Sequence, residues 1–369
     1  MTLARIQKLQ QLTAAAGFDA IAVVPGPNML YFTGLTFHLS ERPTVAFFPV
    51  DGIPVLVVPT LEEGKVRRAP YDVEAFTYDD VQGPVDAFAQ ALRTLGLGGK
   101  KLGVEGRRIR FLELDLMATS NNVPQVSNAD SIIAQLRMRK DAAEINAMRR
   151  AVQIAQQALE ATLPAIKPDV TEKELAAELT LQLLRHGSDS ELPFAPLVAA
   201  GPNSADPHAF PSDQPIKPGE LIIFDWGAAA NGYFSDITRT FAVAGASVDP
   251  QLVRAYQAVQ AANQAGKEAA KPGATGQAVD RATRAVIEEA GFGPYFVHRT
   301  GHGLGMEVHE EPDMKEGSVI PLEPGMTFTI EPGIYLPNLG GIRIEDDVVI
   351  TETGSESLTT LPRELTTLG

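Results

Sequence analysis

The sequence contains two copies of one pattern, and this internal repeat limits the possible folds more than any other feature. Residues 218–227 read Pro-Gly, an apolar strand, an acid, and a glycine two residues later. Residues 324–333 repeat the same order, and the two acids are Asp225 and Glu331. A chain that repeats a strand-forming unit in this way is expected to build an internally duplicated domain.

Each copy leads into a second strand that carries another acid. After the first strand, Asn231 and Gly232 are typical of a two-residue type I′ hairpin turn, which needs positive φ at both positions. Pairing across that turn places Asp225 opposite Thr238, with Asp236 diagonal to Asp225 on the same face. Such diagonal neighbours are roughly 7–8 Å apart, close enough for both carboxylates to hold one or two metal ions.

The second copy supplies the matching acid. Its strand at 341–345 ends in Glu345, the counterpart of Asp236. A single pair of strand acids is more often part of a solvated face, but two pairs in repeated units predict a centre of four carboxylates. Buried carboxylates in such numbers need a cation or must share protons.

Three of the chain's 6 histidines lie between the two copies. His298, His302 and His309 fall in the glycine-rich segment 296–310, which favours a functional site over isolated structural histidines. The glycines at 301, 303 and 305 do not match a dinucleotide-binding loop, because neither their spacing nor a following helix pattern fits. The sequence also lacks the GxSxG and HExxH motifs and any cysteine, so serine, cysteine and zincin-type hydrolysis are unsupported.

The donor set is rich in oxygen and poor in nitrogen. Such a set suits Mn²⁺ or Co²⁺ best, and Zn²⁺ is also possible. Two such ions can activate a bridging water and stabilise a tetrahedral intermediate. Histidines beside them would move protons or stabilise the oxyanion.

The charge balance argues against several classes of partner. With 31 basic and 46 acidic residues, the net charge of −15 disfavours nucleic acid and anionic membranes. No apolar run approaches the roughly 20 residues of a membrane span, and the N-terminus resembles an amphipathic helix, not a signal peptide. A cytoplasmic protein is therefore expected.

We expect two domains, with a boundary at residue 127. Residues 1–127 alternate strand and helix patterns, with buried strands at 20–24, 45–48 and 54–58, and predict a small α/β domain. The glycines and lysines at 96–101 predict a turn, because their spacing is not that of a phosphate-binding loop.

Residues 128–369 are expected to form an α+β domain. A long helical pattern covers 128–163, and its basic residues indicate a solvated connecting helix. Thr171 and Glu174 form a capping box at the start of a second helix, and Asp249 and Thr275 begin two more. The order of helices, hairpin, helices, hairpin agrees with a duplication.

At the repeated acids and the histidine segment, the chain resembles an Xaa-Pro peptidase of the pita-bread metallopeptidase family. This family contains prolidase, aminopeptidase P, methionine aminopeptidase and creatinase, and the similarity covers nearly the whole chain. The resemblance implies a pita-bread (creatinase/aminopeptidase-like) catalytic domain and a set of metal ligands. These would be Asp225, Asp236, His302, Glu331 and Glu345.

The resemblance also implies roles for other residues. Asp236 and Glu345 would bridge two metal ions, and Glu331 would act as general acid/base beside a metal-bridging hydroxide. Further residues would contact the substrate or orient the site. These are His208, His309 and Arg343 as catalytic groups, with His298 and Tyr335 lining the substrate pocket.

The same resemblance implies a homodimer in which His38 of one chain reaches the active site of the other. The expected substrates are peptides with proline in the second position, either dipeptides alone (prolidase) or longer peptides (aminopeptidase P). His186, at the end of a helical pattern, is expected to be structural. Two alternatives share the fold: a creatinase-like hydrolase that needs no metal, and a catalytically silent binding module.

Overall fold

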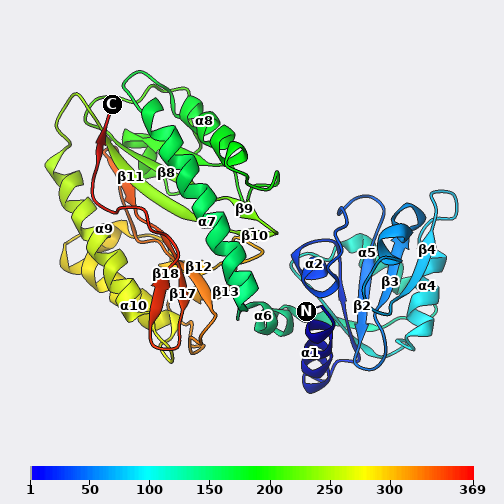
Figure 1. Ribbon diagram of the computed structural model, residues 1–369. Helices are drawn as coiled ribbons and strands as arrows, with labels where there is room; N and C mark the ends of the chain where they lie inside the picture. Colours follow the sequence, from blue (N-terminus) through cyan, green and yellow to red (C-terminus); the bar gives the residue numbers. More distant parts are fainter. Residues whose placement is uncertain (1) are drawn as a thin grey trace. The chain divides into compact units, whose positions relative to one another are not determined.

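The computed structural model describes residues 2–369 and shows two compact units. The first unit ends at Arg137 and the second begins at Met138 (Figure 1). This boundary lies beyond the predicted residue 127 because the helix between them, α6 (Asp130–Arg137), packs against α1 (Thr2–Ala15). No helix in the described residues is long and apolar enough to span a membrane.

The first unit is the predicted α/β domain. Its strands are β1 (Ala20–Val23), β2 (Val45–Pro49), β3 (Val55–Pro59), β4 (Glu74–Tyr78), β5 (Lys101–Val104) and β6 (Gln125–Asn128). They form one sheet in the order β4-β3-β2-β1-β5-β6, in which the central strands are fully buried. The remaining helices of this unit are α2 (Pro27–Thr33), α3 (Glu63–Val66), α4 (Val85–Thr94) and α5 (Phe111–Ala118), with the short 3₁₀ turn η1 (Thr60–Glu62).

We predicted one helix over 128–163, but the structure has two helices there, separated by a break. The prediction of a single continuous helix was wrong. Between α6 and α7 (Ala142–Thr162) the backbone N–H of Lys140 donates to the Gly325 carbonyl. Asp141 then caps α7, accepting from the N–H groups of Ala143 and Glu144. A residue that caps a helix with its side chain has non-helical backbone angles, and the helical pattern does not reveal such a break.

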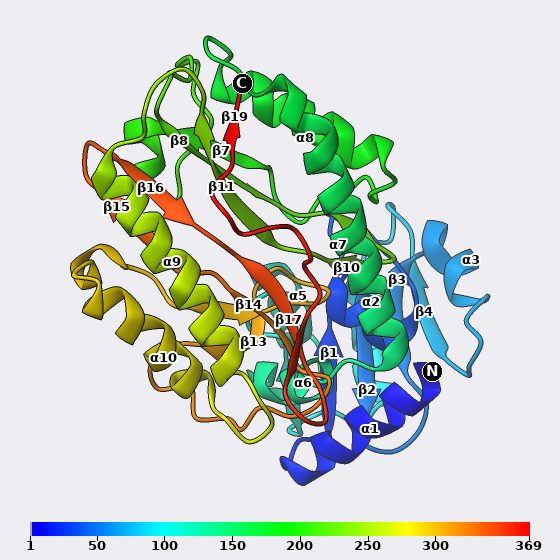
Figure 2. The ribbon, with the colours of Figure 1, turned by 60° about the vertical axis from the view of Figure 1, so that its left-hand side comes forward.

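The second unit holds the other helices, which form two pairs. In Figures 1 and 2, α7 lies beside α8, and α9 lies beside α10. The capping box of Thr171 and Glu174 and the caps at Asp249 and Thr275 are confirmed. The helices are α8 (Glu172–Arg185), α9 (Pro250–Ala269) and α10 (Gly276–Glu289), with 3₁₀ turns η2 (Leu163–Ala165), η3 (Gly201–Ala205) and η4 (Gly293–Tyr295).

The strands of this unit make two larger sheets and two short hairpin ends. One sheet has the order β19-β11-β8-β7, the other β13-β12-β14-β17-β18, and β9-β10 and β15-β16 are two-stranded. The bounds are β7 (Leu197–Ala200), β8 (Leu221–Trp226), β9 (Ala229–Ala230), β10 (Tyr233–Phe234), β11 (Ile237–Val243), β12 (Gly301–Gly303), β13 (Glu310–Met314), β14 (Thr327–Ile330), β15 (Gly333–Leu336), β16 (Gly340–Arg343), β17 (Asp346–Ile350), β18 (Ser355–Ser357) and β19 (Thr367–Leu368).

The first hairpin has the register expected from its turn. Asp225 in β8 pairs with Thr238 in β11, and Tyr233 pairs with Ala230. Asn231 and Gly232 both have positive φ, 54° and 76°, as a type I′ turn requires. The second strand of this hairpin, which follows the turn, is interrupted at residues 235–236. It therefore consists of β10 and then β11.

The second hairpin repeats this construction with β14, β15, β16 and β17. Ile330 pairs with Asp346 at the end of β14, and Gly333 pairs with Arg343 beyond it. Glu345 lies just after β16, so the strand predicted over 341–345 ends two residues early. The hairpins meet where the N–H of Glu345 donates to the Thr238 carbonyl, at 3.1 Å.

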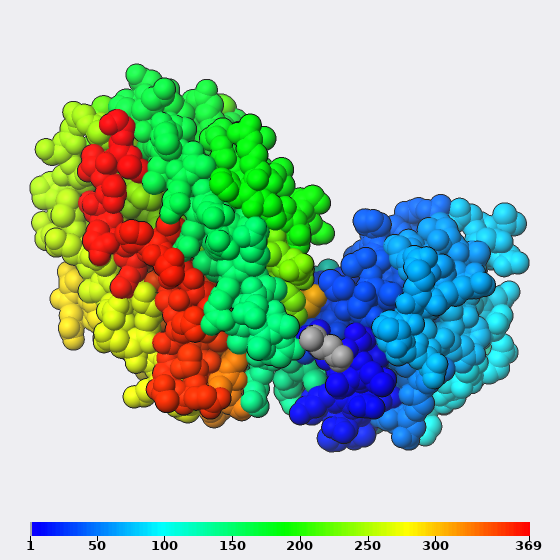
Figure 3. All heavy atoms as spheres, in the orientation of Figure 1, coloured from blue at the N-terminus to red at the C-terminus, as the bar shows by residue number. Residues whose placement is uncertain are grey.

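Helices cover these sheets and bury them. Trp226 at the end of β8 is fully buried, and its indole N–H donates to the Ala155 carbonyl of α7 at 2.9 Å. Figure 3 shows the C-terminal segment in red running over the surface of this unit between α7 and α9. This segment is hydrogen-bonded to the helices on both sides. The backbone N–H of Thr360 donates to Gln156 of α7, and the hydroxyl of Tyr256 in α9 donates to the Arg363 carbonyl.

Candidate metal centre

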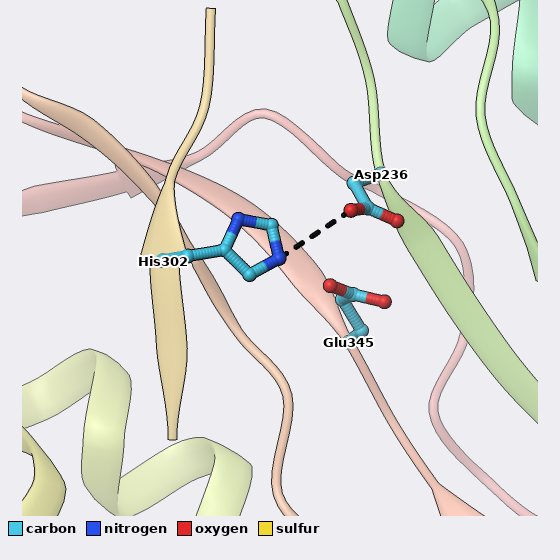
Figure 4. Close-up of side chains that lie close together, drawn as sticks. All are labelled: Asp236, His302 and Glu345. Atoms are coloured by element: carbon cyan, nitrogen blue, oxygen red, sulfur yellow. Dashed lines mark ion pairs between the residues drawn. The ribbon is translucent and has the colours of Figure 1, made fainter. Parts of the chain in front are cut away.

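Three donor side chains from distant parts of the sequence meet in the second unit. Asp236 comes from the interruption between β10 and β11, His302 from β12, and Glu345 from the end of the second hairpin (Figure 4). Their ligand atoms all lie within 4.8 Å of one another, and all three residues are buried. His302 Nε2 is 3.5 Å from Asp236 Oδ2. A buried set of one imidazole and two carboxylates at this spacing suits a divalent metal ion.

Close backbone packing holds His302 in place. Strand β12 lies between β13 and β14, and a Cβ atom at Gly301 would be 1.9 Å from the Thr329 carbonyl oxygen. A Cβ atom at Gly303 would be 2.4 Å from the Glu311 backbone. The glycines of this segment therefore serve close strand packing.

Glu331 and Asp225 extend the group to the five predicted ligands. Glu331 Oε1 is 3.3 Å from His302 Nε2, and its backbone N–H donates to the Thr300 carbonyl. Asp225 Oδ2 accepts from Arg343, whereas Asp225 Oδ1 is buried and has no hydrogen-bond partner in the part of the chain described. An unsatisfied buried acceptor costs about 1–3 kcal/mol, and a cation would satisfy it. The residues present therefore fit a metal ion.

The electrostatics of the group agree with this fit. Burial raises the pKa of Asp236 and of Glu345 well above the usual range, and repulsion from neighbouring carboxylates raises both further. Burial likewise raises the pKa of Glu331 to about 7. Burial and the neighbouring His309 lower the pKa of His302, so its imidazole is neutral, the form that binds metals. A bound cation would relieve the repulsion among these carboxylates.

Arg343 links the centre to a second group of side chains. Its Nη2 donates to Asp225 Oδ2 at 2.6 Å, and its Nη1 donates to the Tyr335 hydroxyl at 2.6 Å. Its Nε donates to the Thr238 hydroxyl at 3.2 Å. The guanidinium therefore orients Asp225 and leaves Oδ1 of that carboxylate available.

Tyr335 connects Arg343 to His298. The hydroxyl of Tyr335 lies 2.8 Å from His298 Nε2, and His298 Nδ1 lies 2.7 Å from the Arg299 carbonyl. Burial lowers the pKa of His298 to about 4 and raises that of Tyr335 to about 12. A neutral imidazole must then donate from Nδ1 to the carbonyl and accept at Nε2 from the tyrosine. The direction of every hydrogen bond from Arg343 to Arg299 is thereby fixed.

The other two predicted catalytic histidines lie at the exposed side of the site. The ring of His309 stands edge-on to that of His302, with centroids 4.3 Å apart. His208 lies in the loop after η3, where the preceding Pro207 carbonyl accepts from Arg343 at 3.4 Å. Both histidines are exposed and accessible to a ligand.

Two histidines lie elsewhere. His38 is on the exposed segment between α2 and β2 in the first unit, and its role across a dimer stays a prediction. His186 is the C-cap residue of α8, the structural position expected for it.

Sequence reasoning missed several residues that support the centre. Thr238 donates to Glu345 Oε2 at 2.7 Å while accepting from Arg343, and Asp347 accepts the backbone N–H of Asp236. The pairing of Thr238 with Asp225 was a usable signal, because it places the hydroxyl between the two hairpins. The contact of Asp347 depends on how the hairpins dock, and the sequence pattern contains no sign of it.

Helix α10 also supports the centre. Asp280 accepts from the backbone N–H and the hydroxyl of Thr300, at 3.1 and 2.7 Å. Arg284, one turn later, bonds to Asp280 and donates to the carbonyls of Phe296 and His298. The carbonyl of Thr300 in turn accepts from the backbone N–H of Glu331. Helix α10 therefore holds both the histidine segment and the backbone at Glu331, just after β14.

Comparisons with known proteins agree with this architecture. Residues 146–352 match the metallopeptidase family M24, and residues 5–139 match the creatinase/prolidase N-terminal domain. The chain is 33% identical to a prolidase from Thermococcus sibiricus, with a TM-score of 0.94 over 100% of this chain and 99% of that one. A dipeptidase from Pyrococcus horikoshii is 38% identical, with a TM-score of 0.92 over 99% and 100% of the two chains. An Xaa-Pro dipeptidase from Bacillus anthracis is 32% identical, with a TM-score of 0.91 over all of both chains.

These matches confirm the predicted fold, a small α/β domain followed by a duplicated pita-bread domain, and the predicted class of metallo-exopeptidase. The buried cluster of Asp236, His302 and Glu345 lies in the second unit, within the matched region. The chain belongs to the metallopeptidase family M24 and carries a creatinase/prolidase N-terminal domain.

Proposed function

We propose that the protein is an Xaa-Pro dipeptidase, which hydrolyses the bond between an N-terminal residue and a following proline. The similarity to the Thermococcus sibiricus prolidase and to the Bacillus anthracis Xaa-Pro dipeptidase, each over the whole chain, supports this specificity. The observation that carries the hydrolytic chemistry is the meeting of Asp236, His302 and Glu345 beside the unpartnered Oδ1 of Asp225.

Two divalent ions would be held by the five predicted ligands, Asp225, Asp236, His302, Glu331 and Glu345. Mn²⁺ suits these donors best, with Co²⁺ or Zn²⁺ as possible substitutes. When bound, such ions supply Lewis acidity and an activated water. Glu331, itself one of these ligands, would also accept and return the proton of that water, because its carboxylate lies 3.3 Å from His302 Nε2 and burial raises its pKa to about 7.

The histidines and Arg343 would act on the substrate. His208 and His309, both exposed at the site, would donate hydrogen bonds to the developing oxyanion and to the departing prolyl nitrogen. His298 and Tyr335 would form part of the pocket wall, kept rigid by their bonds to each other and to Arg343. We further propose a cytoplasmic homodimer in which His38 contacts the partner's site.

The decisive measurement is peptide hydrolysis by one preparation, first chelated and then refilled with Mn²⁺. Ala-Pro, Ala-Pro-Ala and the proline-free dipeptide Ala-Ala would be compared. We expect metal-dependent cleavage of Ala-Pro and little cleavage of the other two. Preference for Ala-Pro-Ala would indicate an aminopeptidase P instead. Metal-bound protein that cleaves none of them would overturn the proposal and favour a creatinase-like or binding function.

A pair of variants tests the ligand assignment. Asp225→Asn keeps the shape of the side chain but removes its charge, and should lower kcat/KM for Ala-Pro by about 10³, because a bound metal contributes several kcal/mol to catalysis. Asp213→Asn is the matched control, since Asp213 is exposed and its ion pair is with Lys173 at the surface. Equal activity of the two variants would argue against Asp225 as a ligand.

A further inference from the structure

The loop that carries His208 depends on its backbone for its position. His208 is exposed, and its imidazole has no hydrogen-bond partner among residues 2–369; only its backbone N–H is bonded, to Asp206 Oδ1 at 2.9 Å. The ring is therefore placed in the site by the course of the loop and not by contacts of its own.

One buried carboxylate binds both ends of this loop. Glu172, the first residue of α8, is 2% exposed. Its Oε1 accepts from the backbone N–H of Ala200, where the chain leaves β7, at 2.7 Å. Its Oε2 accepts from the backbone N–H of Ser212, where the loop ends, also at 2.7 Å. Helix α8 packs beside β7 (Figure 2), so the carboxylate is fixed to a rigid element.

The same carboxylate also supports the middle of the loop. Asn203 Nδ2 donates to Glu172 Oε2 at 2.7 Å and to the Phe210 carbonyl at 3.2 Å. Phe210 is two residues from His208. The side chain of Asn203 thus connects Glu172 to the backbone next to the histidine.

A carboxylate is suited to this place for two reasons. Three N–H groups converge on it, and only an ionised acid can accept from all of them with both oxygens. The start of a helix also favours negative charge, and bonds to an ionised acceptor are stronger than neutral ones. A glutamine would direct an NH₂ group at one set of these donors and lose at least one bond.

The other side of the loop is attached to the strand that carries Arg343. Gly341 in β16 donates its backbone N–H to Ser204 Oγ at 2.8 Å, and Arg343 donates to the Pro207 carbonyl. The loop is therefore held between Glu172 on α8 and β16. Loss of the Glu172 bonds would leave, on the α8 side, the backbone bond from the Lys173 N–H to the Ser212 carbonyl at 3.2 Å and the ion pair of Lys173 with Asp213, both at the end of the loop.

We propose that Glu172 is a positioning residue of the peptidase, which sets His208 for reaction through the loop and through Asn203. This inference rests on the proposed function. Glu172 does not touch the donor cluster, so its substitution should change how His208 is presented and leave metal binding intact.

The test compares three variants of the full-length, Mn²⁺-loaded protein. Glu172→Gln should lower kcat for Ala-Pro about 10- to 100-fold, as loss of a supporting hydrogen-bond partner does at other metal sites. Asn203→Ala should lower kcat less. Glu174→Gln is the matched control, because Glu174 lies in the same turn of α8 and its carboxylate bonds to Thr171, not to the loop backbone, among the described residues. Metal content should be the same in all three.

Two further measurements separate positioning from a general structural effect. In a His208→Ala background, Glu172→Gln should lower kcat for Ala-Pro by no more than about a further twofold. The reason is that the effects of substituting two residues are not additive when one residue acts through the other. Hydrogen exchange of the Ala200 and Ser212 amides should become faster in Glu172→Gln and remain unchanged in Glu174→Gln.

An additive loss in the double variant, or unchanged exchange at Ala200 and Ser212, would overturn the proposal. If Glu172→Gln does not fold, Asn203→Ala is compared instead in the wild type and in His208→Ala. Asn203 is only partly buried, so this variant is expected to fold. Hydrogen exchange does not depend on turnover. A wild-type protein that fails to cleave Ala-Pro would therefore refute the proposed function, which is a different result from failure of the loop measurements.

Discussion

Single residues at the centre bring together more negative charge than the protein itself neutralises. Arg343 is bonded to Asp225, but Asp236, Glu331 and Glu345 depend on hydrogen bonds and on His302. Elsewhere in the same unit, Asp346 is bonded to Arg239 and Lys267, and these cations lower its pKa despite burial. The contrast supports the proposal that a cation binds at these acids.

Metal affinity should therefore weaken as the pH falls. Metal ions bind the ionised carboxylates, whereas the metal-free protein holds protons on acids whose pKa is raised, to about 7 for Glu331. Binding then releases protons, and the affinity should fall about tenfold per pH unit for each proton released. Titration calorimetry with Mn²⁺ at pH 8, 7 and 6 measures this. A constant affinity over that range would contradict the assigned pKa directions.

The same shifts fix the sign of the pH dependence of stability. An acid with a raised pKa in the folded state binds more protons folded than unfolded, between its unfolded pKa and its folded pKa. For Glu331 this window runs from 4.5 to about 7. Across it, these acids should make the metal-free protein less stable as the pH rises, and metal should reverse the trend.

At the scale of elements, the hairpins were predictable and their connections were not. Asn231 and Gly232 fix the turn, and the turn fixes the pairing of Asp225 with Thr238. The interruption at 235–236 and the break before α7 arise from contacts with distant segments, such as the Asp347 carboxylate that accepts the N–H of Asp236. Local patterns do not contain those partners.

Helix α10 should influence catalysis from outside the centre. Asp280→Asn would place an NH₂ group against Arg284 or Thr300 and remove a charge-assisted bond, which costs about 1.5–3 kcal/mol of stability. We expect kcat/KM for Ala-Pro to fall about tenfold, as for other residues that orient metal ligands. Thermal unfolding and kinetics of Asp280→Asn would be measured beside Glu289→Gln, an exposed position on the same helix. Indistinguishable variants would show that α10 is not needed to fix the site.

At the scale of the whole molecule, the division at Arg137 separates the donor cluster from the first unit. The chain divides into two compact units, and the α/β pattern with its buried strands predicts the strands and helices of the first. The boundary itself was harder to predict, because the helical pattern runs across it and only the packing of α6 on α1 assigns that helix to the first unit.

Metal should stabilise the second unit specifically. A ligand at 100 times its Kd adds about 2.7 kcal/mol, which for a domain of this size corresponds to roughly 5–10 °C in Tm. Differential scanning calorimetry with Mn²⁺ and then with a chelator should show that shift in the wild type and a smaller one in Asp225→Asn. A transition that does not respond to metal would mean that the cluster binds none.

The arrangement of the donors also has a consequence for the time at which the protein becomes active during its synthesis. Domains fold as they leave the ribosome, the N-terminal one first. The donor cluster, however, joins the first hairpin to Glu345 near the end of the second. A nascent chain that stops short of Glu345 can carry a folded first unit but cannot assemble the cluster. For the hydrolysis proposed at this cluster, activity is therefore expected only after Glu345 has been translated, and chains that end before Glu345 are expected to be inert.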